Sequence, residues 1–275
     1  METQNLVKQF RPLGLEGDII STVIANMTLD GLENAARSSV PSRIHGNVRS
    51  KVNVIRYADD FIDTGATRSI LEKQVKPAIV SFQAERGLTL SEEKTRITRI
   101  DDGFDFLGQN CRKYGGKLLI KPARSNIRSF LGNIKETIRK GRALSAAALI
   151  GVLNPKLRGW ANYHRHIVAG KIFGKIDNCV YNYLWKWMIR KHPRKRKSWL
   201  VRKYWSNGSA PWTFSATVVN KSGKTRTYEL VRLHKIGIRR HVKIKAEANP
   251  FDLQFEEYLD KRKKTVKVSN SMPDY

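Results

Sequence analysis

One short stretch decides the fold, and it reads Val52-Asn53-Val54-Ile55-Arg56-Tyr57-Ala58-Asp59-Asp60-Phe61-Ile62-Asp63. Two apolar runs flank its central Asp-Asp pair, which predicts two short strands joined by a tight turn, because Asp accepts turn geometry. Adjacent carboxylates repel each other, and a divalent cation such as Mg2+ between them and a phosphate relieves that repulsion. The pair therefore indicates a metal clamp on phosphate, with a solvated turn as the alternative.

The string Tyr57-Ala58-Asp59-Asp60 between apolar strands is more specific than the carboxylate pair alone. It resembles the polymerase palm signature of reverse transcriptases. Later segments narrow the resemblance to the reverse transcriptases and splicing maturases that group II introns encode, over about residues 18–261. The resemblance implies that Asp59 and Asp60 are catalytic Mg2+ ligands and that Tyr57 lies beside the primer or the nucleotide.

The positive charge of the chain is concentrated in its last two thirds. The formal net charge is +28 over 275 residues, and residues 1–100 carry only +2 of it. A field of this size attracts a polyanion through phosphate contacts and counterion release. Nucleic acid is therefore the expected partner of residues 101–275.

Other classes of protein fit the sequence poorly. There is no apolar run long enough to span a bilayer and no signal peptide at Met1, so we expect a soluble cytoplasmic protein with no membrane partner. Cys111 and Cys179 have no metal-ligand spacing and are interpreted as ordinary thiols. His164 and His166 have no nearby Cys or carboxylate partner, which makes them a poor zinc site.

Residues 1–122 are interpreted as a partial palm, an antiparallel sheet with helices. Helical spacing predicts a core helix over about residues 18–37 and another over 67–86, with Pro77 at a kink or a break and Gly87 as its stop. The alternation of Phe104 and Phe106 around Asp105 predicts a strand. By resemblance, the primer-contacting residues that follow are Phe106, Leu107 and Gly108.

The chain departs from the family pattern in two places. Leu15 and Glu16 stand where the family usually has Pro and Gln, in a loop that helps to position template and nucleotide. Two-metal catalysis also needs a carboxylate from an upstream palm strand, and no residue of Met1 to Phe10 supplies it. We therefore do not expect polymerisation by this chain alone.

A helical pattern begins at Ser125. Apolar residues recur there at three- and four-residue spacing, with Arg and Lys on the other faces. Residues 123–155 are interpreted as a thumb-like helical segment, with a second helix that Asn154-Pro155 breaks and a third that begins near Lys156.

Residues 156–210 resemble the maturase-specific region of the same family. Aromatic residues among Arg and Lys suit RNA, because bases stack on flat rings while cations meet phosphates. For the aromatic residues a core position is the alternative interpretation. The predicted RNA-binding residues are Arg158, Trp160, Tyr163, Lys191, Arg194, Lys195, Arg196, Lys197, Arg202 and Lys203.

Residues 211–275 are interpreted as a basic C-terminal extension with short strands, including a hairpin that turns at residues 220–224. The predicted fold class is α+β: a partial palm, a helical thumb, a helical maturase domain and a small β-containing C-terminal part. In many relatives a Cys- and His-bearing endonuclease module comes next, and we predict none here.

The predicted function is that of the C-terminal part of a group II intron reverse transcriptase and maturase, which binds intron RNA and assists splicing. One alternative is a polymerase part that works only with a separate N-terminal fragment carrying the missing carboxylate. Another is a nonfunctional remnant of an intron reading frame. A DNA target or primer is a further candidate partner, and the particular intron RNA stays open.

Overall fold

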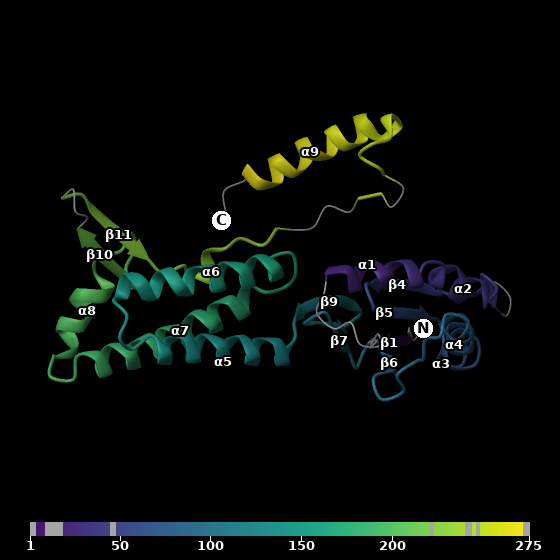
Figure 1. The fold of residues 1–275 in the computed structure, drawn as a ribbon, viewed down its shortest axis with the longest axis horizontal. Helices are drawn as coiled ribbons and strands as arrows, with labels where there is room; N and C mark the ends of the chain where they lie inside the picture. Colours follow the sequence, from purple (N-terminus) through teal and green to yellow (C-terminus); the bar gives the residue numbers. More distant parts are fainter. Residues whose placement is uncertain are drawn as a thin grey trace. The chain divides into compact units, whose positions relative to one another are not determined.

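The computed structural model describes residues 4–8, 19–44, 48–219, 223–239, 244–245 and 248–271. It divides into two compact units, Met1–Leu119 and Ile120–Tyr275 (Figure 1). The predicted loop at Leu13–Gly17 and part of the turn at 220–224 lie outside the described residues. Within the described ranges, every helix is too short or too polar to span a bilayer.

The first unit is built on a four-stranded antiparallel sheet whose strand order is β4-β5-β1-β6. The strands are β1 (Gln4–Lys8), β4 (Asn53–Tyr57), β5 (Asp60–Gly65) and β6 (Arg96–Arg99). Tyr57 pairs with Asp60, so the stretch 52–63 forms the predicted hairpin with a two-residue turn. Phe61 is fully buried, and Val54 is 6 % exposed.

Helices pack apolar side chains into the core of this unit. They are α2 (Leu32–Ser38), α3 (Arg68–Ile70), a π-helical turn (Leu71–Val75) and α4 (Lys76–Ala84), whereas α1 (Ile19–Thr28) exposes Val23, Ile24 and Met27. Leu32, Leu71 and Ile79 are fully buried in the shared core. Their burial and that of the sheet face provide the main stabilisation of this unit.

The two predicted helices differ from the structure in instructive ways. The helix expected over 18–37 is two helices, because Gly31 between them has a left-handed φ of 87°. Met27 on the first of these helices is 74 % exposed, although its spacing predicts a core position. Pro77 is the second residue of α4 and follows the π-helical turn, so the helical path is irregular just before Pro77 but does not break there. Gly87, with φ of 64°, ends that helix as predicted.

Two smaller sheets complete the first part of the chain. A two-stranded sheet pairs β2 (Arg43–Ile44) with β3 (Val48–Arg49). A three-stranded sheet consists of β7 (Phe104–Phe106), β8 (Gln109–Tyr114) and β9 (Lys117–Pro122). The strand predicted around Asp105 is therefore present, and it is followed by a second tight hairpin.

The second unit is a bundle of helices with a β-hairpin packed against it (Figure 1). The helices of the bundle are α5 (Arg124–Lys140), α6 (Ala146–His164), α7 (Gly170–Lys191) and α8 (Lys197–Trp205). Short 3-10 turns at Leu233–Lys235 and Leu253–Phe255 and the helix α9 (Glu256–Ser271) follow later in the chain. The predicted hairpin is β10 (Ser215–Val219) and β11 (Thr225–Glu229). Apolar side chains of α5, α6, α7 and α8 share one core.

The predicted helix break at Asn154-Pro155 is wrong, because α6 runs through both residues. Leu149, Leu153 and Leu157 lie on the same face of α6 and are fully buried, and this packing keeps the helix continuous across the lost backbone hydrogen bond. Asn154 also anchors the hairpin: its Nδ2 donates to the Glu229 carbonyl at 2.8 Å and its Oδ1 accepts from the Val231 amide at 2.9 Å.

His164 belongs to the core of the second unit. Its side chain is fully buried, its ring centroid lies 4.4 Å from that of Trp160, and Nε2 lies 3.2 Å from Asn126 Oδ1. Nδ1 is buried without a hydrogen-bond partner among the described residues. Burial, followed by the nearby His166, lowers the pKa of His164 to about 4, so the ring is neutral at pH 7.

This histidine predicts a loss of stability in acid. The unfolded side chain binds a proton near pH 6.5 and the folded one only near pH 4, so the free energy of unfolding falls as the pH drops between these values. The expected contribution is about 3 kcal/mol. Denaturant unfolding at pH 7 and pH 4 should show a smaller acid loss for His164→Gln than for the wild type, and His166→Gln should retain most of it. Equal acid losses in wild type and His164→Gln would contradict this assignment.

Candidate functional site

The turn between β4 and β5 holds the two predicted metal-binding carboxylates. Ala58 adopts a left-handed backbone with φ of 52°, which is unusual for a residue with a Cβ. Arg56 supports this conformation, since its Nη1 donates to the Ala58 carbonyl at 3.3 Å and to Asn26 Oδ1 on α1 at 2.7 Å. Asp59 and Asp60 are half-buried. The tip is thus a strained turn that one arginine ties to a neighbouring helix.

The turn between β7 and β8 is strained in the same way. Phe106 pairs with Gln109, and the two residues between them, Leu107 and Gly108, have φ of 49° and 73°. Two successive left-handed residues make the tight hairpin turn that matches the twist of the strands. Glycine adopts this conformation easily, whereas leucine does so at a cost of about 1–3 kcal/mol.

The two turns meet at one pocket of about 560 Å³ in the first unit. Asp60 lines it together with Phe106 and Leu107, so a predicted metal ligand and two predicted primer contacts lie at the same cavity. Tyr57 is 66 % exposed, and it is not among the lining residues, nor are Asp59 and Gly108. Strained residues concentrate at functional sites, and here the strained Leu107 lines the pocket together with Asp60, which follows the turn of the strained Ala58.

The described residues do not complete a metal centre at this tip. No group of three or more His, Cys, Asp or Glu side chains lies close enough together there to hold an ion. Strand β1 lies beside β5, with Lys8 opposite Phe61, and its residues Gln4–Lys8 carry no carboxylate. Asp59 and Asp60 alone offer fewer oxygen ligands than a two-metal site requires.

The second unit carries a cationic groove between α5 and α7. Its volume is about 620 Å³. Two apolar side chains, Ile138 and Trp187, form part of its wall, and Tyr183 adds an aromatic hydroxyl. The remaining lining residues all bear a positive charge, and they are Lys135, Arg139, Arg142, Lys186, Arg190 and Lys191. We call this set of residues the α5–α7 groove.

A second depression of about 520 Å³ shares Tyr183 with the α5–α7 groove. It adds Arg124 and Arg128 from the first turns of α5. Because α5 has 17 residues, the two depressions together follow a helix about 25 Å long. Positive charge is therefore distributed along the helix rather than concentrated at one position.

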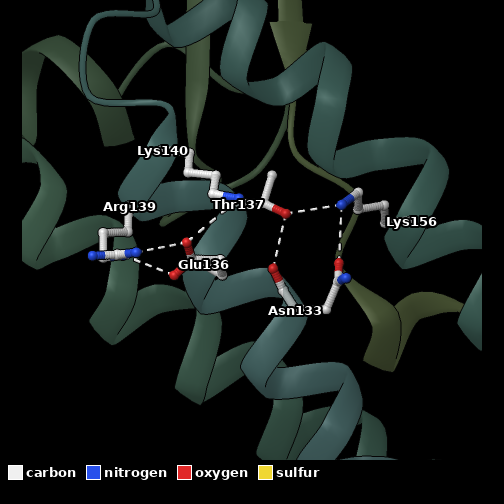
Figure 2. Close-up of polar contacts among 6 residues, drawn as sticks. All are labelled: Asn133, Glu136, Thr137, Arg139, Lys140 and Lys156. Carbon is white, nitrogen blue, oxygen red and sulfur yellow. Dashed lines mark hydrogen bonds and ion pairs between the residues drawn. The ribbon is translucent and has the colours of Figure 1, made fainter.

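Some cations near the groove are engaged within the protein, as Figure 2 shows. Glu136 accepts from Arg139 through two contacts of 2.7 Å and also pairs with Lys140 at 3.7 Å. Lys156 of α6 donates to Asn133 Oδ1 and Thr137 Oγ1, both at 2.9 Å. By contrast, Lys135, Lys186 and Arg190 have no ion-pair partner among the described residues, which leaves their charge available to an anion.

The predicted RNA-binding residues between Lys191 and Lys203 form a basic run, which begins at the end of α7 and continues into α8. Trp199 organises it, because the Nζ atoms of Lys195 and Lys203 lie 5.3 Å and 4.7 Å from the centroid of its ring. Burial lowers the pKa of His192, and the charges of Lys203, Lys191 and Lys195 lower it further. Exposed members of this run are Arg194, Lys195, Arg196, Lys197, Arg202 and Lys203.

The other predicted RNA-binding residues occupy different environments. Lys191 turns inward, where its Nζ donates to the carbonyls of Arg142 at 3.3 Å and Leu144 at 2.6 Å. Trp160 stacks on Phe130 at 4.8 Å and donates from Nε1 to Asn126, as a core residue does. Arg158 and Tyr163 are exposed on α6. RNA contact by each of these residues stays a prediction.

Sequence reasoning missed most of the α5–α7 groove. On α7, Tyr183, Lys186 and Arg190 are separated by three and four residues and so share one helical face. Lys135 and Arg139 show the same four-residue spacing on α5. This signal was present in the sequence, but only the packing of the two helices shows that the faces meet.

Family comparisons assign both parts of the chain. Residues 9–111 match the model for the reverse transcriptase (RNA-dependent DNA polymerase) family, which includes the strained tip at Ala58. Residues 127–205 match the model for the group II intron, maturase-specific domain, which includes the α5–α7 groove and the basic run.

Individual relatives are more distant. The chain is 30 % identical over 112 residues to the ribosomal operon-associated A protein of Euglena longa, which is 40 % of this chain and 21 % of that protein. It is 29 % identical over 170 residues to an uncharacterized 91 kDa protein in the cob intron of Schizosaccharomyces pombe, which is 52 % of this chain and 21 % of that protein. The chain thus spans about a fifth of the length of these curated relatives.

The order of the two matched regions carries the assignment. A region that matches reverse transcriptases and contains the Asp-Asp hairpin is followed by a region that matches the maturase-specific domain, and one relative is named as a protein in the cob intron. The chain therefore belongs to the family of reverse transcriptases and maturases that group II introns encode.

Proposed function

We propose that this chain binds the structured RNA of a group II intron and assists its splicing. The observation that carries the proposal is the α5–α7 groove, where six cationic side chains and two aromatic ones line a single opening. Cations contact phosphates with release of counterions, and aromatic rings receive unstacked bases of RNA loops. The basic run around Trp199 extends the same chemistry beyond the groove.

Polymerisation needs more than the first unit contains. Reverse transcriptases generally use Mg2+, and the described residues fit that ion only in part, because Asp59 and Asp60 have no third carboxylate beside them. A second candidate function is therefore a polymerase part that requires a separate fragment. The pocket that joins Asp60 with Phe106 and Leu107 favours it, and the test is primer extension with a fragment that carries the upstream palm.

The groove predicts a specific salt dependence. The double variant Lys186→Ala and Arg190→Ala removes two phosphate contacts, so the slope of log K against log salt should fall by about two units and affinity should weaken. Binding is measured to a structured group II intron RNA and to an unrelated RNA of equal length. The matched control is Lys171→Ala with Lys175→Ala, which removes the same charge from exposed positions on α7 outside the groove. Equal losses in both double variants would show generic attraction and favour the remnant alternative.

The basic run should contribute separately. Replacing Lys195, Arg196 and Lys197 by Ala should weaken RNA binding and flatten the salt slope by up to about three units. All three side chains are exposed, so the substitutions should not affect folding. An unchanged slope would remove the run from the interface.

The Asp59-Asp60 turn should be dispensable for RNA binding. Asp59→Ala is expected to change the affinity for intron RNA by less than about twofold, because this carboxylate belongs to the first unit and the cations of the proposed interface belong to the second. The same titrations measure it. A large loss of affinity would show that the tip and the basic surfaces act as one site.

A further inference from the structure

A further pocket in the second unit is lined mainly by aromatic rings, whereas the α5–α7 groove is lined mainly by cations. Its volume is about 220 Å³, and it lies where α7, α8 and the segments flanking the β10–β11 hairpin come together. Aromatic rings dominate its wall, and they belong to Tyr181, Trp205, Trp212 and Phe214. The rings of Tyr181 and Trp205 lie 4.8 Å apart, and those of Trp205 and Phe214 lie 5.3 Å apart.

Trp212 stands out among these rings because it is both exposed and strained. Its side chain is 57 % exposed, and its φ is 57°, a conformation that a bulky residue adopts only when its surroundings impose it. Arg232 imposes it from both sides: Nη1 donates to the Pro211 carbonyl at 3.2 Å and to Thr213 Oγ1 at 3.4 Å. An apolar ring is thus held open to solvent at the rim of a pocket.

A chain of hydrogen bonds fixes Arg232 in turn. Its Nη2 lies 3.4 Å from His234 Nε2, and His234 Nδ1 lies 2.7 Å from Asp177 Oδ2 on α7. Asp177 also accepts from the backbone amides of Leu233 at 2.8 Å and His234 at 2.9 Å. The carboxylate is therefore engaged by neighbouring donors, and the position of Trp212 is anchored to the rigid bundle.

Trp205 lines the same pocket and carries a buried polar atom without a partner in the described part of the chain. Its side chain is 5 % exposed, and its Nε1 is buried with no hydrogen-bond partner among the described residues. A buried donor without an acceptor is costly, and such groups are rare in proteins.

We propose that this pocket receives a single unstacked nucleobase of the bound RNA. A base combines a flat face that stacks on the exposed Trp212 ring with acceptor atoms for the Arg232 guanidinium, which lines the same pocket. An aliphatic side chain of a protein partner offers no acceptor to this guanidinium, and the strongly basic second part of the chain favours a polyanion. The inference rests on the proposed RNA binding and adds a base-recognition site to it.

The test separates bases from phosphates. The full chain is titrated with a single-stranded RNA of about twelve nucleotides and with an abasic strand of the same length and charge. Wild type should prefer the strand with bases, and Trp212→Ala should lower that preference by at least about fivefold, since one stacked base is worth that much or more. The salt slope should not change, because no cation is removed.

Two further variants control the measurement. Trp212→Phe keeps an aromatic face and should retain most of the preference. Phe251→Ala removes another exposed aromatic ring, 94 % exposed and outside the pocket, and should leave the preference unchanged. Near-ultraviolet circular dichroism checks that each variant is folded.

The outcomes distinguish the two proposals. A preference for bases that persists unchanged in Trp212→Ala overturns the pocket proposal and leaves RNA binding intact. A wild-type chain that binds both strands equally well has no base site, which also overturns it. Failure of the wild type to bind either strand or the intron RNA overturns the proposed function together with the inference that rests on it.

Discussion

The packing of α5 against α7 is the constraint on which the rest of the second unit depends. Ile134 and Ile138 of α5 share a buried core with Leu184 and Met188 of α7. The end of α7 is fastened as well, because Trp187 Nε1 donates to the Gly141 carbonyl at 3.0 Å. Once these apolar faces of α5 and α7 pack together, the helical faces beside them must lie along the edge of the contact. Those faces carry Lys and Arg, so burial of one set of residues fixes the position of the other.

This arrangement is electrostatically unfavourable in the protein alone. Six cationic side chains line one groove, and among them Arg139 has a carboxylate partner, Glu136, in the described part of the chain. Like charges in proximity destabilise the folded state, and the burial of the apolar faces of α5 and α7 offsets that cost. A phosphate chain relieves the same repulsion and releases counterions when it binds. Under the proposed function, RNA binding therefore relieves a charge repulsion that the fold already contains.

The sequence predicted local structure well and tertiary relations poorly. The Asp59-Asp60 hairpin follows from apolar runs and turn chemistry, and Gly87 follows from its freedom at positive φ. The predicted helix break at Pro155 was wrong, because the burial of the surrounding leucines outweighed the local tendency of proline to break a helix. The groove was missed for a similar reason: Lys135 and Lys186 lie far apart in the chain, and only helix packing brings them to one opening. The strain at Trp212 has no local signal, since it depends on Arg232, which is distant in the chain.

The two units differ in how far their chemistry is complete, and this difference bears on function. In the first unit, Ala58 and Leu107 lie in strained turns, and Asp60 and Leu107 line one pocket, while strand β1 beside the strand of Asp60 brings no carboxylate. The ligand set that the proposed polymerase function requires is therefore incomplete among the described residues. In the second unit, the groove presents its cations and aromatic rings on rigid helices and requires nothing further to meet a phosphate chain. The proposed RNA binding uses only the second unit and calls on no residue that the described chain lacks, whereas the proposed polymerase function needs a further carboxylate that the described residues do not bring to the tip.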